Sequence, residues 1–133
     1  MPHQVIDTPD APHPRGHYSQ AIRAGNMIFL SGQLPVVPGG DGTEFPPDME
    51  DQALQVMRNV EAILQAAGAT LADIVSVQVL VPGDAQWKPF NEVYARVMGD
   101  HRPARTVFRG SEMPIPGILV EVNAIAVVTP EGN

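Results

Sequence analysis

The chain has 133 residues, with 8 Lys+Arg against 15 Asp+Glu and a net charge of −7. This length suits one domain, in which we expect residues 1–16 to form an extended arm. The acidity argues against nucleic acid as the main partner, because phosphate binding needs clustered positive charge. No apolar run of about 18 residues predicts a membrane span, and the lack of cysteine excludes disulfides and thiolate nucleophiles. No secretory leader is apparent, so we expect a cytoplasmic protein.

The first part of the chain predicts a small antiparallel unit. Gly25-Asn26 is a two-residue hairpin signal between two apolar runs. Prolines crowd the arm before this hairpin and the stretch after it, so both should be largely irregular. The expected elements are a short strand at 4–6, strands at 19–24 and 27–31, and a long loop at 34–47.

Two helices are predicted in the middle of the chain. Asp48 can cap the first one, apolar residues then recur at helical spacing over 53–67, and Gly68 suits its end. The second, shorter helix should begin near Pro89, which favours the first helical position. Gly99 should close it.

Three further strands complete the prediction, at 74–81, 104–109 and 118–128. Alternation along the first of them places four residues on one face: Val75, Val77, Val79 and Val81. The order β-β-α-β-α-β-β predicts an α+β fold, with one sheet and two helices on one face in a ferredoxin-like two-layer arrangement.

The last strand is apolar on both faces. One face carries Ile118, Val120, Val122, Ala124, Ala126 and Val128, and the other carries Leu119, Ile125 and Val127. Two helices cover only one face of a sheet, and a large bare apolar patch is disfavoured in a soluble monomer. We therefore expect the second face to be buried against other subunits. The alternative is that the arm and the 34–47 loop fold over it.

Three of the few cations lie in HRPARTVFRG at 101–110. Alternation places Arg105 and Arg109 on one face of the predicted strand and Phe108 on the other, where it should join the core. Arginine offers a planar fork that binds carboxylates in a bidentate manner. Arg109 is either a solvated strand end or part of a site, and Arg102 is a loop charge.

Glu121 is the most unusual residue of the last strand, because it interrupts an apolar run. A carboxylate there needs a partner or a shifted pKa, and Arg105 in the preceding strand is the natural candidate. The pair is either a structural ion pair or a base beside an arginine that binds an anion. The residues alone leave both open.

The sequence gives only weak signals for other kinds of functional site. The four histidines show no metal-ligand spacing, so no metal site is expected, and no GxSxG, Walker or GxGxxG motif appears. Ser31-Gly32-Gln33 ends a strand and exposes backbone N–H groups that can bind an anion. Tyr18 and Asn91 are polar residues near predicted element ends. Each is more often a local hydrogen-bonding residue than a catalyst.

Five short motifs in order resemble the Rid family, the reactive intermediate deaminases also known as endoribonuclease L-PSP-like proteins. The resemblance runs from about residue 16 to 128. The motifs are Tyr18-Ser19-Gln20-Ala21, Ser31-Gly32-Gln33, Phe90-Asn91-Glu92-Val93-Tyr94, Arg102-Pro103-Ala104-Arg105-Thr106 and Val120-Glu121-Val122. Each motif is weak alone, and their order and spacing carry the resemblance.

The resemblance implies a chorismate-mutase-like homotrimer with a central barrel and sites between subunits. It also implies hydrolysis of small 2-imino or 2-enamino acids to 2-oxo acids and ammonia, without metal or organic cofactor. By this resemblance Arg105 grips the substrate carboxylate and Glu121 positions or activates water. Tyr18, Ser31 and Asn91 would line the pocket, with backbone groups near Gly32.

The chain departs from common members of that family near the implied pocket. Val107 stands where some members carry cysteine, Asn123 stands where a second glutamate is common, and the segment between Val107 and Glu121 is about one residue longer. Arg109 could therefore select a dicarboxylate such as 2-aminomuconate. A second alternative is a non-catalytic trimer that binds small carboxylates. Ribonuclease activity, attributed to relatives, is disfavoured by the net charge.

Overall fold

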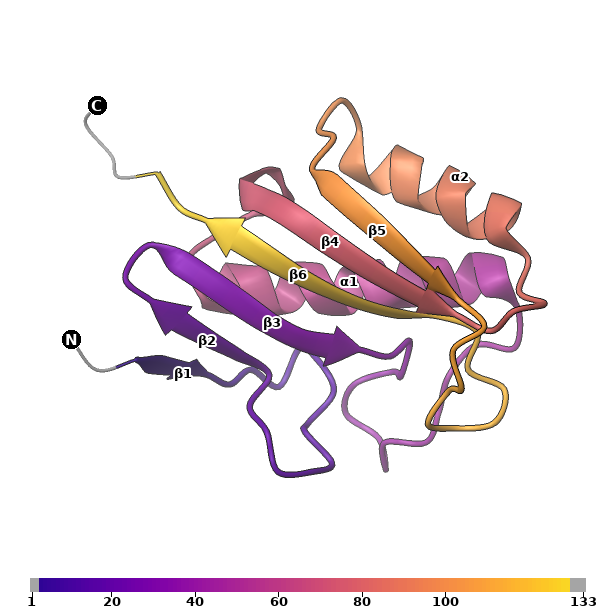
Figure 1. Ribbon diagram of the computed structural model, residues 1–133. Helices are drawn as coiled ribbons and strands as arrows, with labels where there is room; N and C mark the ends of the chain where they lie inside the picture. Colours follow the sequence, from indigo (N-terminus) through magenta and orange to yellow (C-terminus); the bar gives the residue numbers. More distant parts are fainter. Residues whose placement is uncertain (1–2, 130–133) are drawn as a thin grey trace.

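The computed structural model describes residues 3–129, which form one six-stranded sheet with both helices on one side (Figure 1). The elements in chain order are β1 (Gln4–Ile6), β2 (Ala21–Ala24), β3 (Met27–Gln33), α1 (Met49–Ala66), a 3₁₀ turn (Leu71–Asp73), β4 (Ile74–Val81), α2 (Trp87–Met98), β5 (Ala104–Arg109) and β6 (Glu121–Val127). The predicted α+β class and order are confirmed, and β1 is the short strand expected at 4–6 in the arm.

The strand order is β1-β2-β3-β6-β4-β5, and β4 and β5 are the one parallel pair within 3–129. The last strand therefore lies in the middle of the sheet, between β3 and β4, and β5 is an edge strand. Figure 1 shows α1 running behind the sheet and α2 alongside β5. A βαβ connection through α2 produces this parallel pair.

The helices begin and end where local chemistry favours it. The Asp48 carboxylate accepts a hydrogen bond from the backbone N–H of Asp51 at 2.9 Å and caps α1. Gly68 follows α1 with a φ of 85°, a backbone conformation that suits glycine. The second helix begins two residues before Pro89 rather than at it, so Pro89 lies in the first turn, where no intrahelical N–H is required.

The core lies between the helices and one face of the sheet. Val77, Val79 and Val81 of β4 are buried in it, beside the alternate residues of β6. Val75 was predicted to share this face, but it is 47% exposed. A register shift between Ile74 and Ser76 against β6 is the cause, because a β-bulge there turns Val75 outward.

The opposite face, called the open face below, carries exposed apolar side chains. They include Val5, Met27, Phe29, Val75 and Phe108. Phe108 was predicted to join the core, and it is 46% exposed instead. Its backbone lies opposite Leu80, whose side chain points away from the helices, so Phe108 belongs to the open face. Neither helix is long and apolar enough to cross a membrane, within the described residues.

Candidate active site

A β-bulge in β3 shapes one part of the candidate site. Leu30 lies opposite Ala124 and Gln33 lies opposite Val122, so Ser31 and Gly32 together face one residue of β6. Bulges of this kind bend a strand and redirect its side chains. The backbone N–H of Ser31 donates to the carbonyl of Gln20 at 3.0 Å, and its hydroxyl donates to the carbonyl of Ser19 at 2.7 Å. The bulge is thus held against the segment that carries Tyr18.

Glu121 lies directly over this bulge. A Cβ added to Gly32 would collide with Oε2 of Glu121 and would lie 2.9 Å from its Cδ, so the lack of a side chain at Gly32 makes room for the carboxyl. The side chain is half-buried, and this burial raises the pKa of Glu121 above its ordinary value of 4.5. The carboxyl is therefore easier to protonate than an exposed glutamate, as suits a group that exchanges protons.

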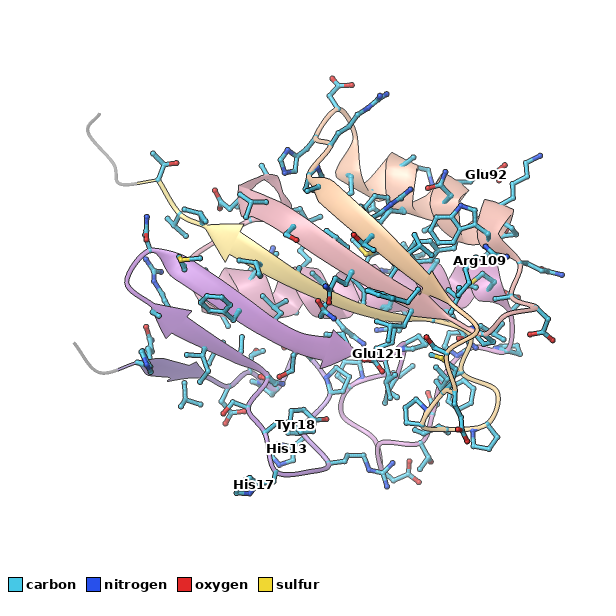
Figure 2. All side chains as sticks on the ribbon, in the orientation of Figure 1. His13, His17, Tyr18, Glu92, Arg109 and Glu121 are labelled. Carbon is cyan, nitrogen blue, oxygen red and sulfur yellow. The ribbon has the colours of Figure 1, made fainter. Side chains whose placement is uncertain are left out.

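A cleft of about 670 Å³ opens beside this carboxyl. Tyr18, Ser31, Gly32 and Glu121 all line it, so four of the predicted site residues meet in one cavity. Figure 2 shows Tyr18 and Glu121 at the lower end of the sheet, with His13 next to Tyr18. The arm and the loop that carries Pro114 and Ile115 form the other walls.

Three buried amide side chains hold the loops around the cleft. Gln52 of α1 donates to the carbonyls of Pro46 and Gly117, each at 2.9 Å, and accepts from the N–H of Leu119 at 2.7 Å. Asn59 of the same helix donates to the carbonyls at positions 34 and 36. Each amide pairs backbone groups that would otherwise be buried without a partner.

Gln20 does the same for the arm. Its amide accepts from the N–H of Thr8 at 2.7 Å and donates to the carbonyls of Thr8 and Pro12, each at 3.0 Å. Sequence reasoning did not assign these anchoring roles. A signal existed for two of them, because Gln52 and Asn59 interrupt the apolar stripe of α1.

A second group of predicted residues lies at the junction of β5 and α2. Nη1 of Arg105 donates to Oδ1 of Asn91 at 2.8 Å. The guanidinium carbon lies 5.1 Å from the ring centroid of Trp87 and 4.8 Å from that of Tyr94, which is cation–π range. Trp87 was missed by sequence reasoning, and Tyr94 was named there only within a family motif, with no role at the site.

The predicted pairing of Arg105 with Glu121 does not occur within one chain. Their strands are not neighbours, since β4 lies between β5 and β6. Arg105 is in register with Val77, which faces the helices, whereas Glu121 is in register with Leu80 on the open face. The sequence placed them on consecutive strands, and the sheet order separates them.

Arg109 belongs with Arg105 rather than with the cleft. It is the last residue of β5, is exposed, and pairs with Val81, so it points to the same side as Arg105. Four residues of strand separate the two Cα atoms by about 13 Å. Figure 2 shows Arg109 toward α2, apart from Tyr18 and Glu121. Within 3–129, no group of three His, Asp or Glu side chains could hold a metal ion.

The seven predicted residues thus form two groups on one chain. The first, called the carboxylate half, consists of Tyr18, Ser31, Gly32 and Glu121 around the cleft. The second, called the cation half, consists of Arg105 and Asn91, with Arg109 at the end of the same strand. The carboxylate half can place water and exchange protons, and the cation half can bind an anion.

The chain is similar to known proteins over most of its length. Residues 8–128 match the family model described as Endoribonuclease L-PSP. A RutC family protein of Pyrococcus horikoshii is 43% identical over 123 residues, 92% of this chain and 96% of that protein. Reactive Intermediate Deaminase A, chloroplastic, of Arabidopsis thaliana is 36% identical and matches 92% of this chain and 65% of its own length. The crystal structure of Escherichia coli TdcF with bound serine has a TM-score of 0.87 at 36% identity and covers 95% of this chain and 99% of its own.

Proposed function

The chain belongs to the endoribonuclease L-PSP family, also known as the Rid family, and we propose that it is a cofactor-independent hydrolase that converts a small 2-imino or 2-enamino carboxylic acid to the 2-oxo acid and ammonia. The observation that carries this proposal is Arg105, which is held by Asn91 and retains N–H groups for a carboxylate. Two further facts are consistent with a substrate of this class. Relatives bear the name reactive intermediate deaminase, and a similar structure contains bound serine, itself a small carboxylate.

The working site is assembled between two copies of the chain. The cation half of one copy meets the carboxylate half of the next, which brings together the two groups that one chain keeps apart. The exposed apolar residues of the open face, Met27, Phe29 and Val75 among them, supply a reason to associate. The assembly is a homotrimer, in which three open faces pack around a central barrel.

The reaction needs few protein groups. Arg105 binds the carboxylate and fixes the orientation of the imine carbon. That carbon is electrophilic once the imine nitrogen is protonated, so water attacks it without a strong nucleophile. Glu121 accepts a proton from this water and delivers it to the nitrogen of the carbinolamine that forms. The C–N bond then breaks and ammonia leaves, while the hydroxyl gives its proton back to Glu121 and its oxygen stays on the carbon as a ketone. Tyr18 and Ser31 line the pocket around these atoms.

Arg109 gives the proposal a specialised form. Because it shares a strand and a side with Arg105, it could bind the second carboxylate of a dicarboxylic imino or enamino acid. The test compares monocarboxylic and dicarboxylic substrates in the wild type and in Arg109→Ala. A selective loss on the dicarboxylate supports this form, and equal rates on both substrates in both proteins contradict it.

The main test measures ammonia release from imino acids that an amino acid oxidase generates in the assay. We expect Arg105→Ala to lower kcat/KM by about 10³-fold, since it removes the charged anion contact. Arg102→Ala is the matched control, because Arg102 is exposed in the preceding loop, and it should retain full activity. Full activity in Arg105→Ala would overturn the site. Carboxylate binding without ammonia release in the wild type would instead support a binding module.

A further inference from the structure

Arg105 has a specific aromatic environment. Its guanidinium carbon lies 5.1 Å from the ring centroid of Trp87 and 4.8 Å from that of Tyr94. Phe90 lies between Trp87 and Tyr94 in the sequence. The centroid of its ring is 5.2 Å from that of Trp87 and 5.8 Å from that of Tyr94. Phe90 makes no cation–π contact with Arg105 of the kind found for its two neighbours. The guanidinium thus contacts two of the three rings.

The spacing of these residues on α2 explains the arrangement. Trp87, Asn91 and Tyr94 lie at positions i, i+4 and i+7, so they share one side of the helix. The helix therefore presents a ring, an amide oxygen and a second ring to β5. The amide accepts the Nη1–H of Arg105 at 2.8 Å, and the two rings contact the guanidinium. Three side chains of one helix thus contact the guanidinium of Arg105.

Core packing accounts for the buried ring of Tyr94 but not for the contacts that Arg105 makes with this helix. Arg105 is exposed and lies on an edge strand, a position at which a long side chain normally samples several rotamers. Trp87 is only half-buried, so it also contributes less to the core than a fully buried aromatic residue would. The hydroxyl of Tyr94 is buried with no hydrogen-bond partner within 3–129, so the ring, rather than the hydroxyl, is the part of Tyr94 that contacts its neighbours.

We propose that Trp87 and Tyr94 are positioning residues that hold the Arg105 guanidinium in one orientation, with its remaining N–H groups directed outward to receive a carboxylate. The inference rests on the proposed function for its kinetic consequence, but the ordering of Arg105 is a property of the chain itself. Loss of either ring frees the side chain, which must then be ordered each time a carboxylate binds.

The expected kinetic consequence is a change in KM with little change in kcat. Arg105 contacts the carboxylate, which does not react, so its contacts are similar in the bound substrate and in the transition state. Weakening such uniform binding raises KM and leaves kcat nearly unchanged. We expect Trp87→Leu and Tyr94→Leu to raise KM by about 10-fold each, a size typical of side-chain ordering on binding. Trp87→Phe and Tyr94→Phe keep a ring face and should restore KM to within about threefold.

The experiment has three readouts on the full chain: ¹⁵N relaxation of the Arg105 Nε–H group, binding of pyruvate as the carboxylate probe, and the KM and kcat of ammonia release. In the wild type the Nε–H group should be as ordered as the backbone. In Trp87→Leu it should become mobile and pyruvate should bind about 10-fold more weakly. Val93→Ala is the matched control, because it shortens a fully buried side chain of the same helix and lowers stability, and Val93 is not among the residues that contact Arg105.

Two results would overturn the inference. One is an Nε–H group that stays ordered in Trp87→Leu and in Tyr94→Leu, with pyruvate affinity within twofold of the wild type. The other is an equal loss of order and affinity in Val93→Ala, which would make the effect a general consequence of a damaged helix. If no imino acid is hydrolysed, the proposed function fails, and the relaxation and pyruvate data still decide whether the rings position Arg105.

Discussion

The two halves of the candidate site are built in different ways. The cation half is made by side chains, since Arg105 of β5 contacts Asn91, Trp87 and Tyr94 of α2. The carboxylate half is made by backbone, since it depends on the bulge at Ser31-Gly32 and on loops that buried amides hold in place. The first half should therefore respond to changes of side-chain chemistry, and the second to changes of backbone geometry and space.

In the proposed two-copy site neither half is complete alone, so disruption of the assembly should have the largest effect. Phe29→Asp places a charge in the middle of the exposed apolar face, where burial against another copy would leave it unpaired. We expect a monomer by light scattering and a loss of ammonia release of more than about 10³-fold, because neither half acts alone. Ala66→Asp, on the exposed side of α1, should keep both the mass and the activity. A fully active monomer would show that one chain suffices.

Glu121→Gln removes the proton-exchanging group and keeps the shape of the side chain. We expect kcat to fall by about 10² to 10³-fold, which is typical for loss of a general base. The raised pKa of Glu121 predicts that the acid limb of the wild-type rate profile lies above pH 4.5, and that this limb is absent from the residual activity of the variant. An unchanged acid limb in Glu121→Gln would assign the limb to another group.

The raised pKa of Glu121 also makes the stability of the folded chain depend on pH in a defined direction. Burial raises the pKa of Glu121 in the folded chain above its ordinary value of 4.5, so the folded chain binds this proton more tightly than the unfolded chain. The contribution of this group to stability is therefore full below pH 4.5 and is lost as the pH rises through the raised pKa. The difference in thermal midpoint between the wild type and Glu121→Gln should shift in favour of the variant over that pH range.

Gly32→Ala tests whether space at the bulge sets the position of Glu121. The added Cβ would collide with Oε2 of Glu121, the mobile end of a side chain, so the carboxyl can move away at small expense in stability. We expect kcat to fall by about 10-fold or more with little change in thermal midpoint. Gly40→Ala, where an added Cβ meets nothing within 4 Å, should leave both unchanged. A wild-type kcat in Gly32→Ala would separate the bulge from catalysis.

Gln52→Leu should have the smallest effect on catalysis and a clear effect on stability. It leaves the N–H of Leu119 and the carbonyls of Pro46 and Gly117 without their partners. The loss should be about 2–3 kcal/mol of unfolding free energy, with the remaining activity of folded protein reduced only a few-fold. Gln65→Leu, at an exposed position of α1, should change stability by less than about 0.5 kcal/mol. Both should be compared at one protein concentration, since assembly affects the midpoint.

The helices and strands could be predicted because they depend on local chemistry. The order of the strands in the sheet could not be predicted, because it depends on distant pairings. The Asp48 cap, the strand at 74–81 and the strand at 104–109 follow from signals within a few residues of chain. The position of β6 between β3 and β4 depends on pairings across about ninety residues of sequence (between residues 27–33 and 121–127), for which a single sequence carries no signal. This is why Arg105 and Glu121 were expected to meet.

Two residues, Val75 and Phe108, lie on the other side of the sheet from the one predicted. Alternation predicts a side for each residue only while the register is unbroken, so the shift beside Val75 turned that residue outward. Phe108 was placed in the core because alternation puts it opposite Arg105 and Arg109. The alternation holds, but the two arginines lie on the side that the helices cover, so Phe108 lies on the open face. Among the predicted site residues, Arg105 and Glu121 stood out as polar groups in apolar strands, and Tyr18, Ser31 and Asn91 were added by the family resemblance, whereas Trp87 gave neither signal.

The most direct test of the two-copy site is complementation between two inactive variants. Arg105→Ala keeps an intact carboxylate half and Glu121→Gln keeps an intact cation half. When the two are co-expressed with different affinity tags and purified as mixed assemblies, each mixed trimer of the proposed kind should carry two intact halves at about one in three of its interfaces. Ammonia release should then return to about a third of the wild-type rate per chain. Mixed assemblies that stay as inactive as either variant alone would contradict the account.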